Sequence, residues 1–592
     1  MSRIDPHSFY DPEQPAVRRL ELFLRADFPS RTLSGEVLLR LDRPSSGALD
    51  LDTDGLRIAS VTTEDGRPVP HALGEPDPIL GRRLSLDLPP GTDAVRIAYG
   101  TASEATGLQW LEPAQTAGGS HPFLFSQCQP HHARSLLPCQ DSPRVRVTYR
   151  AEITVPAGFT VVMAAAPRGK RPEGSGTTFV FEMPQPIPTY LFALAAGRLE
   201  SRDLGPRSRI WAEPETVEAA AFEFAAIESM IASAEGIFGP YEWERYDMLV
   251  LPPSFPYGGM ENPRLTFLTP TLLAGDRSLV AVVVHELAHS WTGNLVTNAT
   301  MNDFWLNEGF TVWAERRILE VLKGEEAAAL AWALGQGALD RAMERFGPDS
   351  PLTRLKTDLW GVDPDAVYSE VPYEKGARFV ALLERTAGRE VFDRFIRDYI
   401  ARFRFTSITT EEFLAFLEER LPGLAGRVGA EEWLYRPGLP ANAPRFQSAR
   451  MAFVLEMASA WAQGKRPPAE ELRALNPDET LLFLQNLPRP LPAQSLRDLD
   501  GLLGLSGRGN YEILVEWLVI AAQSDYEPVF PKIEEVLSRV GRMKFVRPLF
   551  KALAATARTR ALARRIFEAN QARYHNLTRR VAEAEMAAYP EG

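Results

Sequence analysis

The sequence predicts a multidomain α+β protein, with an antiparallel β-sandwich first, a mixed central domain next and an α-helical domain last. Three observations support this fold class. The chain has 592 residues and a mass of 65.8 kDa, which is too much for one ordinary hydrophobic core. About the first 200 residues alternate apolar and polar side chains, the period of half-buried strands. From about residue 215 onward the apolar residues recur with the helical period instead.

The N-terminal domain, residues 1–199, is predicted to be the β-sandwich. Residues 145–155 alternate strictly between apolar side chains and charged or hydroxyl side chains, as a strand with one buried face requires. Residues 20–26 and 37–41 repeat this pattern. Clusters of Pro, Gly and Asp separate the apolar segments, as turns between strands do.

The central domain is predicted to span residues 200–436 and to be mainly helical. Its one strand candidate is residues 248–251, a short apolar run that precedes two prolines. The stretch that follows this domain, residues 437–445, is rich in proline and has the composition of a linker.

The C-terminal domain, residues 446–592, is predicted to be almost wholly helical. Its helices are short, such as those expected at residues 512–522 and 558–572. Stacked helix pairs in an armadillo-like arrangement would bury such helices, although the segment contains no clear sequence repeat.

Composition indicates a globular protein of the cytoplasm. Hydrophobic residues make up 45% and charged residues 24% of the chain, which is ordinary for this class. The net charge of -12 argues against a general nucleic-acid binder and is compatible with cationic substrates. Two cysteines do not make a disulfide framework, so a reducing compartment is expected. We expect no signal peptide and no membrane span, because the first residues lack an apolar stretch and no run of eighteen apolar residues occurs.

The segment His285-Glu286-Leu287-Ala288-His289, followed after 18 residues by Glu308, predicts a metal centre. Two histidines four apart on a helix point the same way, so both can bind one Zn²⁺, with Glu308 as the third ligand. A catalytic zinc keeps one position for water, and Glu286 lies beside the ligands, where it can accept that water's proton. The motif therefore predicts a metallohydrolase with one zinc ion. The alternative is a helix that carries two surface histidines and a glutamate.

The residues around this motif predict two helices. The apolar residues 279–284 run into the motif without a break, so the first helix is expected to be buried, and its ionisable groups then need partners. We expect Asp276 to cap this helix and Gly293 to stop it. We expect Asn302 or Asp303 to open the second helix.

Further segments resemble those of one known family. Gly-Gly-Met-Glu-Asn at residues 258–262, upstream of the zinc motif, is similar to the pattern of the M1-type gluzincin aminopeptidases. Other segments resemble one branch of that family, the leukotriene-A4 hydrolase and aminopeptidase B group. These segments are residues 126–129 (SQCQ), 265–276 (LTFLTPTLLAGD), 290–298 (SWTGNLVTN), 371–376 (VPYEKG) and 541–545 (GRMKF).

This resemblance spans nearly the whole chain and implies both a fold and an activity. It implies a β-sandwich, a thermolysin-like catalytic domain and a C-terminal helical domain, in agreement with the periodicities above. It also implies a bacterial zinc aminopeptidase that acts as a monomer on short peptides with a free N-terminal amine, with no nucleic acid or membrane as partner.

An aminopeptidase has to recognise the ammonium group at the end of its substrate. A buried carboxylate near the metal does this with a strong and directional ion pair, and Glu261 is the candidate. The resemblance supports Glu261 and adds Gln129 as a second contact to the amine. Gly258 and Gly259 lack side chains, so an extended substrate backbone can lie against them and pair with them.

The resemblance extends to the remaining substrate contacts. It implies that Gln127, Tyr257 and Met260 lie beside the substrate, within the motifs that carry Gln129 and Glu261.

The resemblance also assigns residues to the other end of the substrate and to the oxyanion. Tyr373 matches the tyrosine that donates a hydrogen bond to the oxyanion. Arg542 and Lys544 match a basic pair that binds the free carboxylate of a short peptide, although such a pair is often a solvated helix end. Asp365 and Tyr368 match residues of the pocket for the first side chain. An aspartate there would favour Arg or Lys, although it could equally be a turn residue or a helix cap.

The expected reaction is removal of the N-terminal residue from a peptide. Glu286 takes the proton of the attacking water and later gives it to the departing amine, while Tyr373 stabilises the oxyanion. An alternative is hydrolysis of a lipid epoxide, because this branch includes such an enzyme and Asp365 and Tyr368 match residues associated with that activity. A third possibility is an inactive homologue that serves as a binding scaffold, and nothing in the sequence supports it.

Overall fold

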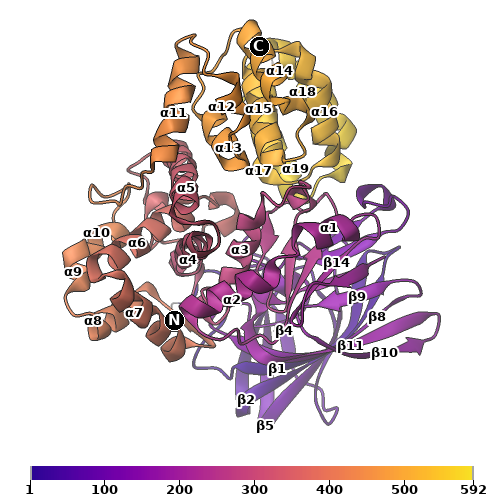
Figure 1. The fold of residues 1–592 in the computed structure, drawn as a ribbon. Helices are drawn as coiled ribbons and strands as arrows, with labels where there is room; N and C mark the ends of the chain where they lie inside the picture. The colour runs from indigo at the N-terminus through magenta and orange to yellow at the C-terminus, as the bar shows by residue number, and fades with distance from the viewer. Residues whose placement is uncertain (1–2, 590–592) are drawn as a thin grey trace.

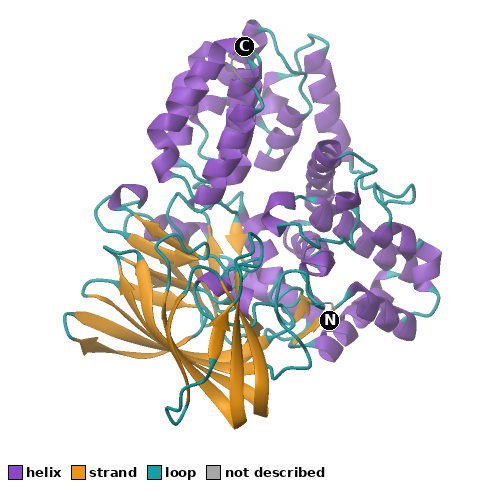
Figure 2. Ribbon diagram, turned by 180° about the vertical axis from the view of Figure 1, so that it is seen from behind, coloured by secondary structure: helices purple, strands orange, loops and turns teal. Residues whose placement is uncertain are grey.

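The computed structural model of the protein describes residues 3–589. Figure 1 shows strands gathered in the indigo to magenta N-terminal part, and helices alone in the orange to yellow part at the top. The central part, between these two, mixes a small sheet with helices. Figure 2, seen from behind, shows the same separation of strands from helices. The predicted fold class is confirmed.

The N-terminal part contains two β-sheets. The strands are β1 (Val17–Asp27), β2 (Thr32–Thr53), β3 (Arg57–Thr63), β4 (His71–Leu73), β5 (Arg82–Gly100), β6 (Leu108–Leu111), β7 (Phe123–Ser126), β8 (Arg146–Pro156), β9 (Thr160–Met163), β10 (Ala166–Glu173), β11 (Gly176–Pro188) and β12 (Leu194–Gly197). The larger sheet has the order β10-β11-β8-β1-β2-β5-β3, with β4 paired to β5. The smaller sheet has the order β6-β7-β12-β9.

Strand alternation accounts for the burial in these sheets. In β8, which contains most of the predicted strand 145–155, Val147, Tyr149, Ala151 and Ile153 are buried while the side chains between them are partly exposed. The pairings are antiparallel, as predicted, with one difference: β1 runs parallel to β8. A parallel pair needs a long connection, and here the strands between β1 and β8 provide it.

The central part contains a five-stranded sheet. Its strands are β13 (Glu200–Asp203), β14 (Ser208–Ala212), β15 (Tyr246–Val250), β16 (Gly259–Met260) and β17 (Leu265–Leu268). Their order is β13-β14-β15-β17-β16, so β16 is an edge strand and only one of its sides is paired. β15 confirms the strand predicted at residues 248–251.

Helices surround this sheet and carry the zinc motif. They are α1 (Val217–Glu223), α2 (Ile227–Phe238), α3 (Val280–Ala288), α4 (Trp305–Lys323), α5 (Glu325–Phe346), α6 (Gly376–Ala387), α7 (Arg389–Phe403), α8 (Thr410–Arg420), α9 (Leu424–Val428) and α10 (Ala430–Tyr435). A small parallel pair, β18 (Val296–Asn298) and β19 (Thr406–Ile408), lies among them. The central helices and the N-terminal sheets share one continuous hydrophobic core.

The predicted starts of the two motif helices are wrong by a few residues. α3 begins at Val280 with Leu279 as its N-cap, because Arg277 has a positive φ of 58° that no helix accommodates. The carboxylate of Asp276 instead accepts a hydrogen bond from the Ser278 amide in the preceding turn.

The predicted start of the second motif helix is wrong for a different reason. α4 begins after Phe304, and the carboxylate of Asp303 accepts hydrogen bonds from the amide and hydroxyl of Thr410 and pairs with Lys356. Asn302 accepts a hydrogen bond from the Leu359 amide. Tertiary partners therefore take the side chains that local rules would assign to a cap.

The C-terminal part consists of helices with their own hydrophobic core. They are α11 (Ala449–Ala462), α12 (Ala469–Arg473), α13 (Pro477–Gln485), α14 (Ala493–Leu503), α15 (Tyr511–Gln523), α16 (Phe530–Arg539), α17 (Met543–Ala555), α18 (Ala557–Asn570) and α19 (Asn576–Ala587). α15 and α18 confirm the two helices predicted here. The predicted linker lies between α10 and α11, in a segment without helix or strand. The domain boundaries at residues 199 and 436–446 stay predictions.

No helix within residues 3–589 combines the length and the apolar character that crossing a lipid bilayer requires.

Candidate active site

Helices α3 and α4 bring the three predicted metal ligands together. His285 lies on α3, His289 is its C-cap residue, and Glu308 lies in the first turn of α4. The Nε2 atoms of both histidines lie 3.4 Å from Oε2 of Glu308. One possible ligand atom from each residue lies within 4.8 Å of the others.

The arrangement fits a zinc ion. Oε2 of Glu308 is buried and accepts no hydrogen bond from the described residues, whereas buried polar atoms normally have a partner. It faces the Nε2 atoms of two imidazoles, which is the donor set of a His₂Glu catalytic site. A bound cation would satisfy this oxygen and both nitrogens at once.

The other ring nitrogens of the two histidines have partners that hold the rings in place. His285 Nδ1 lies 3.2 Å from Oε2 of Glu315. His289 Nδ1 lies 3.0 Å from the carbonyl oxygen of Thr292 and 3.1 Å from the hydroxyl of Thr311. Such partners turn Nε2 towards a metal. Glu315 was missed in the sequence, although it lies two helical turns after Glu308 and therefore on the same face of α4.

Glu286 is buried beside these ligands. Burial raises its pKa to about 7, against the opposing effect of His285 and His289, and a cation at the ligands would lower it again. A base with a pKa near neutrality transfers protons efficiently in both directions. A side chain at position 259 would collide with the Glu286 carboxylate, so Gly259 is required for the base to occupy its place.

Glu261 lies within the same cluster. Its carboxylate is buried and lies within 4.8 Å of ligand atoms of Glu286 and His289. Gln129, from the N-terminal part, donates a hydrogen bond from Nε2 to Oε1 of Glu261 at 3.2 Å. Asn294 donates to the backbone carbonyl of Glu261 at 2.7 Å. The structure therefore brings the predicted amine-binding residues to the metal ligands.

The predicted glycine segment is the edge strand β16 and the residue before it. Gly258 accepts a hydrogen bond from the Thr269 amide, and Met260 pairs with β17. Gln127 donates to the Met260 sulfur at 3.2 Å, and Tyr257 is partly buried next to the pair. The free side of β16 is thus available to an extended peptide.

The C-terminal part holds this segment from outside. The amide of Gly541 donates to the carbonyl of Pro253 at 2.8 Å, and the amide of Met543 donates to the carbonyl of Pro256 at 2.9 Å. These bonds are backbone to backbone, so they fix the main chain that leads into β16.

Arg542, between those two amides, is buried, and Lys544 is mostly exposed. Both pair with Glu512 of α15, at 3.4 Å from Arg542 Nη1 and 2.8 Å from Lys544 Nζ. A Cβ at Gly258 would lie 2.7 Å from Arg542 Nη2, so Arg542 of the predicted basic pair reaches the glycine segment. Glu512 was missed, because no sequence pattern links it to positions 30 or so residues away.

Tyr373 lies in a short π-helical turn, Val371–Lys375, that leads into α6. Its ring centroid is 6.1 Å from that of His285 and 5.9 Å from that of Tyr368. Burial raises the pKa of Tyr373 well above its ordinary value, so the phenol keeps its proton. Tyr373 is therefore placed as a hydrogen-bond donor next to the metal ligands.

Asp365 is neither a cap nor a turn residue. Asp363 caps the short helix Pro364–Val367, while the carboxylate of Asp365 points to the N-terminal part. Its Oδ2 lies 2.9 Å from Nε2 of His132. His132 was missed, since only the fold brings these two positions together.

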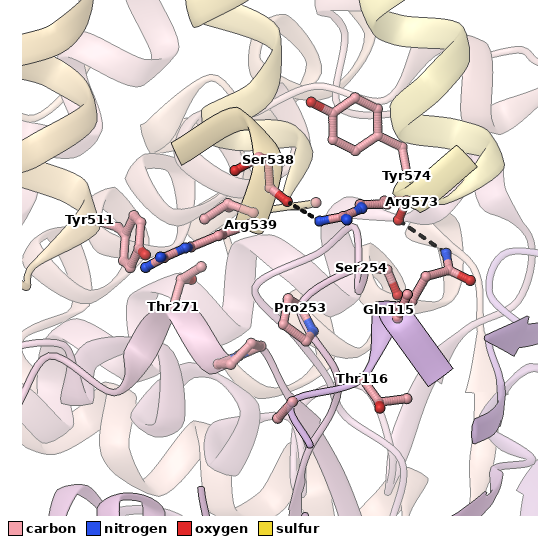
Figure 3. A pocket seen from close by; sticks show the side chains of 15 residues that line it. Gln115, Thr116, Pro253, Ser254, Thr271, Tyr511, Ser538, Arg539, Arg573 and Tyr574 are labelled. Atoms are coloured by element: carbon pink, nitrogen blue, oxygen red, sulfur yellow. Dashed lines mark hydrogen bonds between the residues drawn. The ribbon is translucent and has the colours of Figure 1, made fainter. Parts of the chain in front are cut away.

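A separate pocket of about 310 Å³ lies where the three parts of the chain meet (Figure 3). Gln115 Nε2 donates to the Arg573 carbonyl at 3.2 Å, and Arg573 Nη1 donates to the Ser538 carbonyl at 3.4 Å. The predicted metal ligands do not line this pocket. It meets the site at Thr271, whose hydroxyl accepts a hydrogen bond from Arg542.

Comparison with known proteins places this site in a family. Residues 10–191 match the peptidase M1 N-terminal domain, residues 222–430 the peptidase family M1 domain and residues 475–586 the leukotriene A4 hydrolase C-terminal domain. The chain is 39% identical to leukotriene A-4 hydrolase of Xenopus laevis over 97% of this chain and 98% of that one. It is also 39% identical to aminopeptidase B of Rattus norvegicus, over 95% and 92% of the two chains.

A solved structure agrees with these matches along the whole chain. Yeast LTA4 hydrolase in complex with bestatin superimposes with a TM-score of 0.92 at 33% identity, covering 99% of this chain and 97% of that one. The predicted family resemblance is therefore confirmed. The chain belongs to peptidase family M1, and it is a zinc metallopeptidase of the leukotriene A4 hydrolase and aminopeptidase B branch.

Proposed function

We propose that the protein removes the N-terminal residue from short peptides, with one zinc ion held by His285, His289 and Glu308. One observation supports this most directly. The buried carboxylate of Glu261, held by Gln129, lies within 4.8 Å of ligand atoms on His289 and Glu286. A negative charge at that place suits the ammonium group of a peptide whose first carbonyl is at the metal.

The catalytic step divides between the metal and Glu286. Zinc, when bound, supplies a Lewis acid that polarises the first carbonyl and lowers the pKa of a water molecule. Glu286 accepts the proton of the attacking water and then gives it to the departing amine. Burial favours its protonated form and a cation at the ligands favours its carboxylate form, so one carboxyl group can act as base and then as acid.

Recognition of the chain end depends on Glu261 and on β16. The ion pair between Glu261 and the substrate ammonium forms in a buried place, where solvent screens it little. The substrate backbone pairs with the free edge of β16 at Gly258 and Gly259. A peptide with a blocked N-terminus lacks the charge that Glu261 requires.

The other substrate contacts stabilise the oxyanion and measure length. Tyr373 donates its phenol hydrogen to the oxygen that becomes negative during attack. Arg542 and Lys544 share the single negative charge of Glu512, so the group keeps one net positive charge for the carboxylate of a short peptide.

Hydrolysis of a lipid epoxide is a second candidate. The match of residues 475–586 to the leukotriene A4 hydrolase C-terminal domain, and the 39% identity to a leukotriene A-4 hydrolase, favour it. The same metal ligands and Tyr373 would act in this reaction. Asp365 and Tyr368 would then lie next to the hydrocarbon chain of the lipid epoxide.

The first experiment is hydrolysis of a panel of aminoacyl-nitroanilides by the purified protein. We expect release of the dye, loss of activity with a chelator and recovery when zinc is added back. Glu286→Gln should retain zinc and lose roughly 100-fold or more in kcat. N-acetylated versions of the same substrates should not be cleaved. A zinc-loaded protein that is inert to the whole panel, or that cleaves blocked and free substrates alike, would disprove the aminopeptidase function.

We also propose that the protein acts in the cytoplasm as a monomer. Its two cysteines, Cys128 and Cys139, are both buried and unpaired, which suits a reducing compartment. Sedimentation of the purified, zinc-loaded protein tests the monomer.

A further inference from the structure

One loop of the N-terminal part contacts two residues that are predicted to bind the substrate's first residue. One is expected to bind its amine and the other its side chain. Gln129 reaches the amine-binding carboxylate of Glu261 at 3.2 Å. His132, three residues later, reaches Asp365 at 2.9 Å. Asp365 lies in the segment that continues to Tyr368 and then to Tyr373, whose rings are 5.9 Å apart. The loop therefore spans from the place of the substrate amine to the place of its first side chain.

The contact between His132 and Asp365 is specific and shielded. The side chains are 20% and 19% exposed. His132 Nδ1 lies 2.9 Å from the hydroxyl of Thr106, so both ring nitrogens are occupied. Only Oδ2 of Asp365 is used, and Oδ1 accepts no hydrogen bond from the described residues. Asp365 can therefore bind His132 and a substrate group at the same time.

We propose that His132 is a specificity-determining residue, which sets how strongly the enzyme prefers basic over neutral N-terminal residues by controlling the net charge of the His132–Asp365 pair. This inference rests on the proposed aminopeptidase function. With a neutral imidazole the pair carries one negative charge, and Oδ1 attracts the guanidinium or ammonium of Arg or Lys. With a protonated imidazole the pair is neutral, and the advantage of a basic residue is reduced.

Among the titratable groups around the His132–Asp365 pair, His132 is the one whose charge changes in the pH range of the experiment. Asp365 faces it from the central part, Arg134 and Asp141 from its own segment, His131 beside it and His575 from the C-terminal part. Arg134 and Asp141 form a buried ion pair at 3.1 Å, so their charges offset each other.

The neighbouring imidazoles stay uncharged. Burial lowers the pKa of His131 well below its ordinary value and that of His575 to about 4. Burial is the largest effect and opposes the charge on His132, but the hydrogen bond to Asp365 and the negative charges of Asp365 and Asp141 together outweigh it and raise the pKa of His132. The imidazole therefore carries its proton below this raised pKa and loses it as the pH rises through it.

The test is the ratio of kcat/KM for arginyl- and leucyl-nitroanilide, measured from about pH 5.5 to about pH 8.5. Protonation of Glu286 affects both substrates alike and cancels in the ratio. In the wild-type enzyme we expect the ratio to rise with pH by roughly fivefold or more. His132→Gln keeps a neutral donor to Asp365, so its ratio should be independent of pH and equal to the high-pH value of the wild type.

Two further variants complete the experiment. Asp365→Asn should give a low ratio at every pH, chiefly through a higher KM for the arginyl substrate. His121→Gln removes an exposed histidine elsewhere and should reproduce the wild-type curve. A flat wild-type ratio, or a His132→Gln curve that follows the wild type, would overturn the proposal. If His132→Gln does not fold, the pH dependence of the wild-type ratio alone still tests the proposal. An enzyme that is inert to both substrates would instead contradict the proposed function.

Discussion

The phenol of Tyr373 combines two properties that an oxyanion donor needs. Its ring lies 6.1 Å from the ring of the metal ligand His285, and burial keeps its pKa well above the ordinary value. The hydroxyl is therefore protonated throughout the pH range in which Glu286 acts as a base. A preorganised donor of this kind stabilises charge that develops only in the transition state.

Removing that hydroxyl should reduce turnover without disturbing the metal. We expect Tyr373→Phe to lower kcat by roughly 100- to 1000-fold, with KM and zinc content close to those of the wild type. Steady-state kinetics and metal analysis measure this. Tyr435→Phe, which removes an exposed tyrosine hydroxyl bound to Glu411, is the matched control. A Tyr373→Phe enzyme with normal kcat would exclude the role.

At the residue scale, the sequence predicted what is local and left out what the fold assembles. His285 and His289 were predictable because a helix places positions four apart on one face. Glu315 was also within reach, by the same rule applied to α4. His132 and Glu512 were not, because their partners Asp365 and Arg542 lie far from them in the sequence.

At the scale of elements, α4 and α6 cross at two glycines. A Cβ on Gly376 would lie 2.8 Å from the Cα of Gly309, and a Cβ on Gly309 would lie 2.7 Å from the Cα of Gly376. Both neighbours are backbone atoms, which cannot turn aside as a flexible side chain can. This close crossing sets the distance between Glu308, one residue before Gly309, and Tyr373, three residues before Gly376.

Adding a methyl group at this crossing should separate the helices. We expect Gly376→Ala to lower the free energy of unfolding by about 1–3 kcal/mol and to lower kcat more than zinc content. Urea unfolding and kinetics measure the two effects. Gly501→Ala, on α14 with no atom near the new Cβ, should be neutral or stabilise by about 0.5–1 kcal/mol. Equal stability of both variants would show that the crossing tolerates a side chain.

Elements were predicted best where burial has a clear period. The alternation in residues 145–155 became β8, and the apolar run before His285 became α3. Helix starts were predicted less well, because Asp276 and Asp303 accept hydrogen bonds from other groups and do not cap the helices.

At the scale of the whole molecule, Arg146 joins the N-terminal part to the catalytic centre. It lies at the start of β8 and is buried. Its guanidinium donates to the carbonyl of Asn294 at 2.6 Å and to the hydroxyl of Thr297 at 2.8 Å. Asn294 in turn donates to the backbone of Glu261. The position of Glu261, the proposed amine-binding residue, therefore depends on a residue of the N-terminal part.

Replacing this arginine should loosen the connection. We expect Arg146→Met to lower the free energy of unfolding by about 2–4 kcal/mol, because several buried acceptors lose their donor, and to raise KM more than it lowers kcat. Arg150→Met is the control on the same strand, where the side chain is 40% exposed and pairs with Glu152. Unfolding in guanidinium and steady-state kinetics measure the two effects. Equal effects of the two variants would contradict the proposed link between Arg146 and Glu261.

The bonds from Gly541 and Met543 to Pro253 and Pro256 have a consequence for how the enzyme is made. Ribosomes build the chain from its N-terminus, so β16, the strand that we propose binds the peptide, is synthesised long before Gly541 and Met543. Until those residues emerge and dock, the segment that leads into β16 lacks these two backbone hydrogen bonds. We therefore expect a chain that is still on the ribosome to be inactive until its C-terminal part has docked.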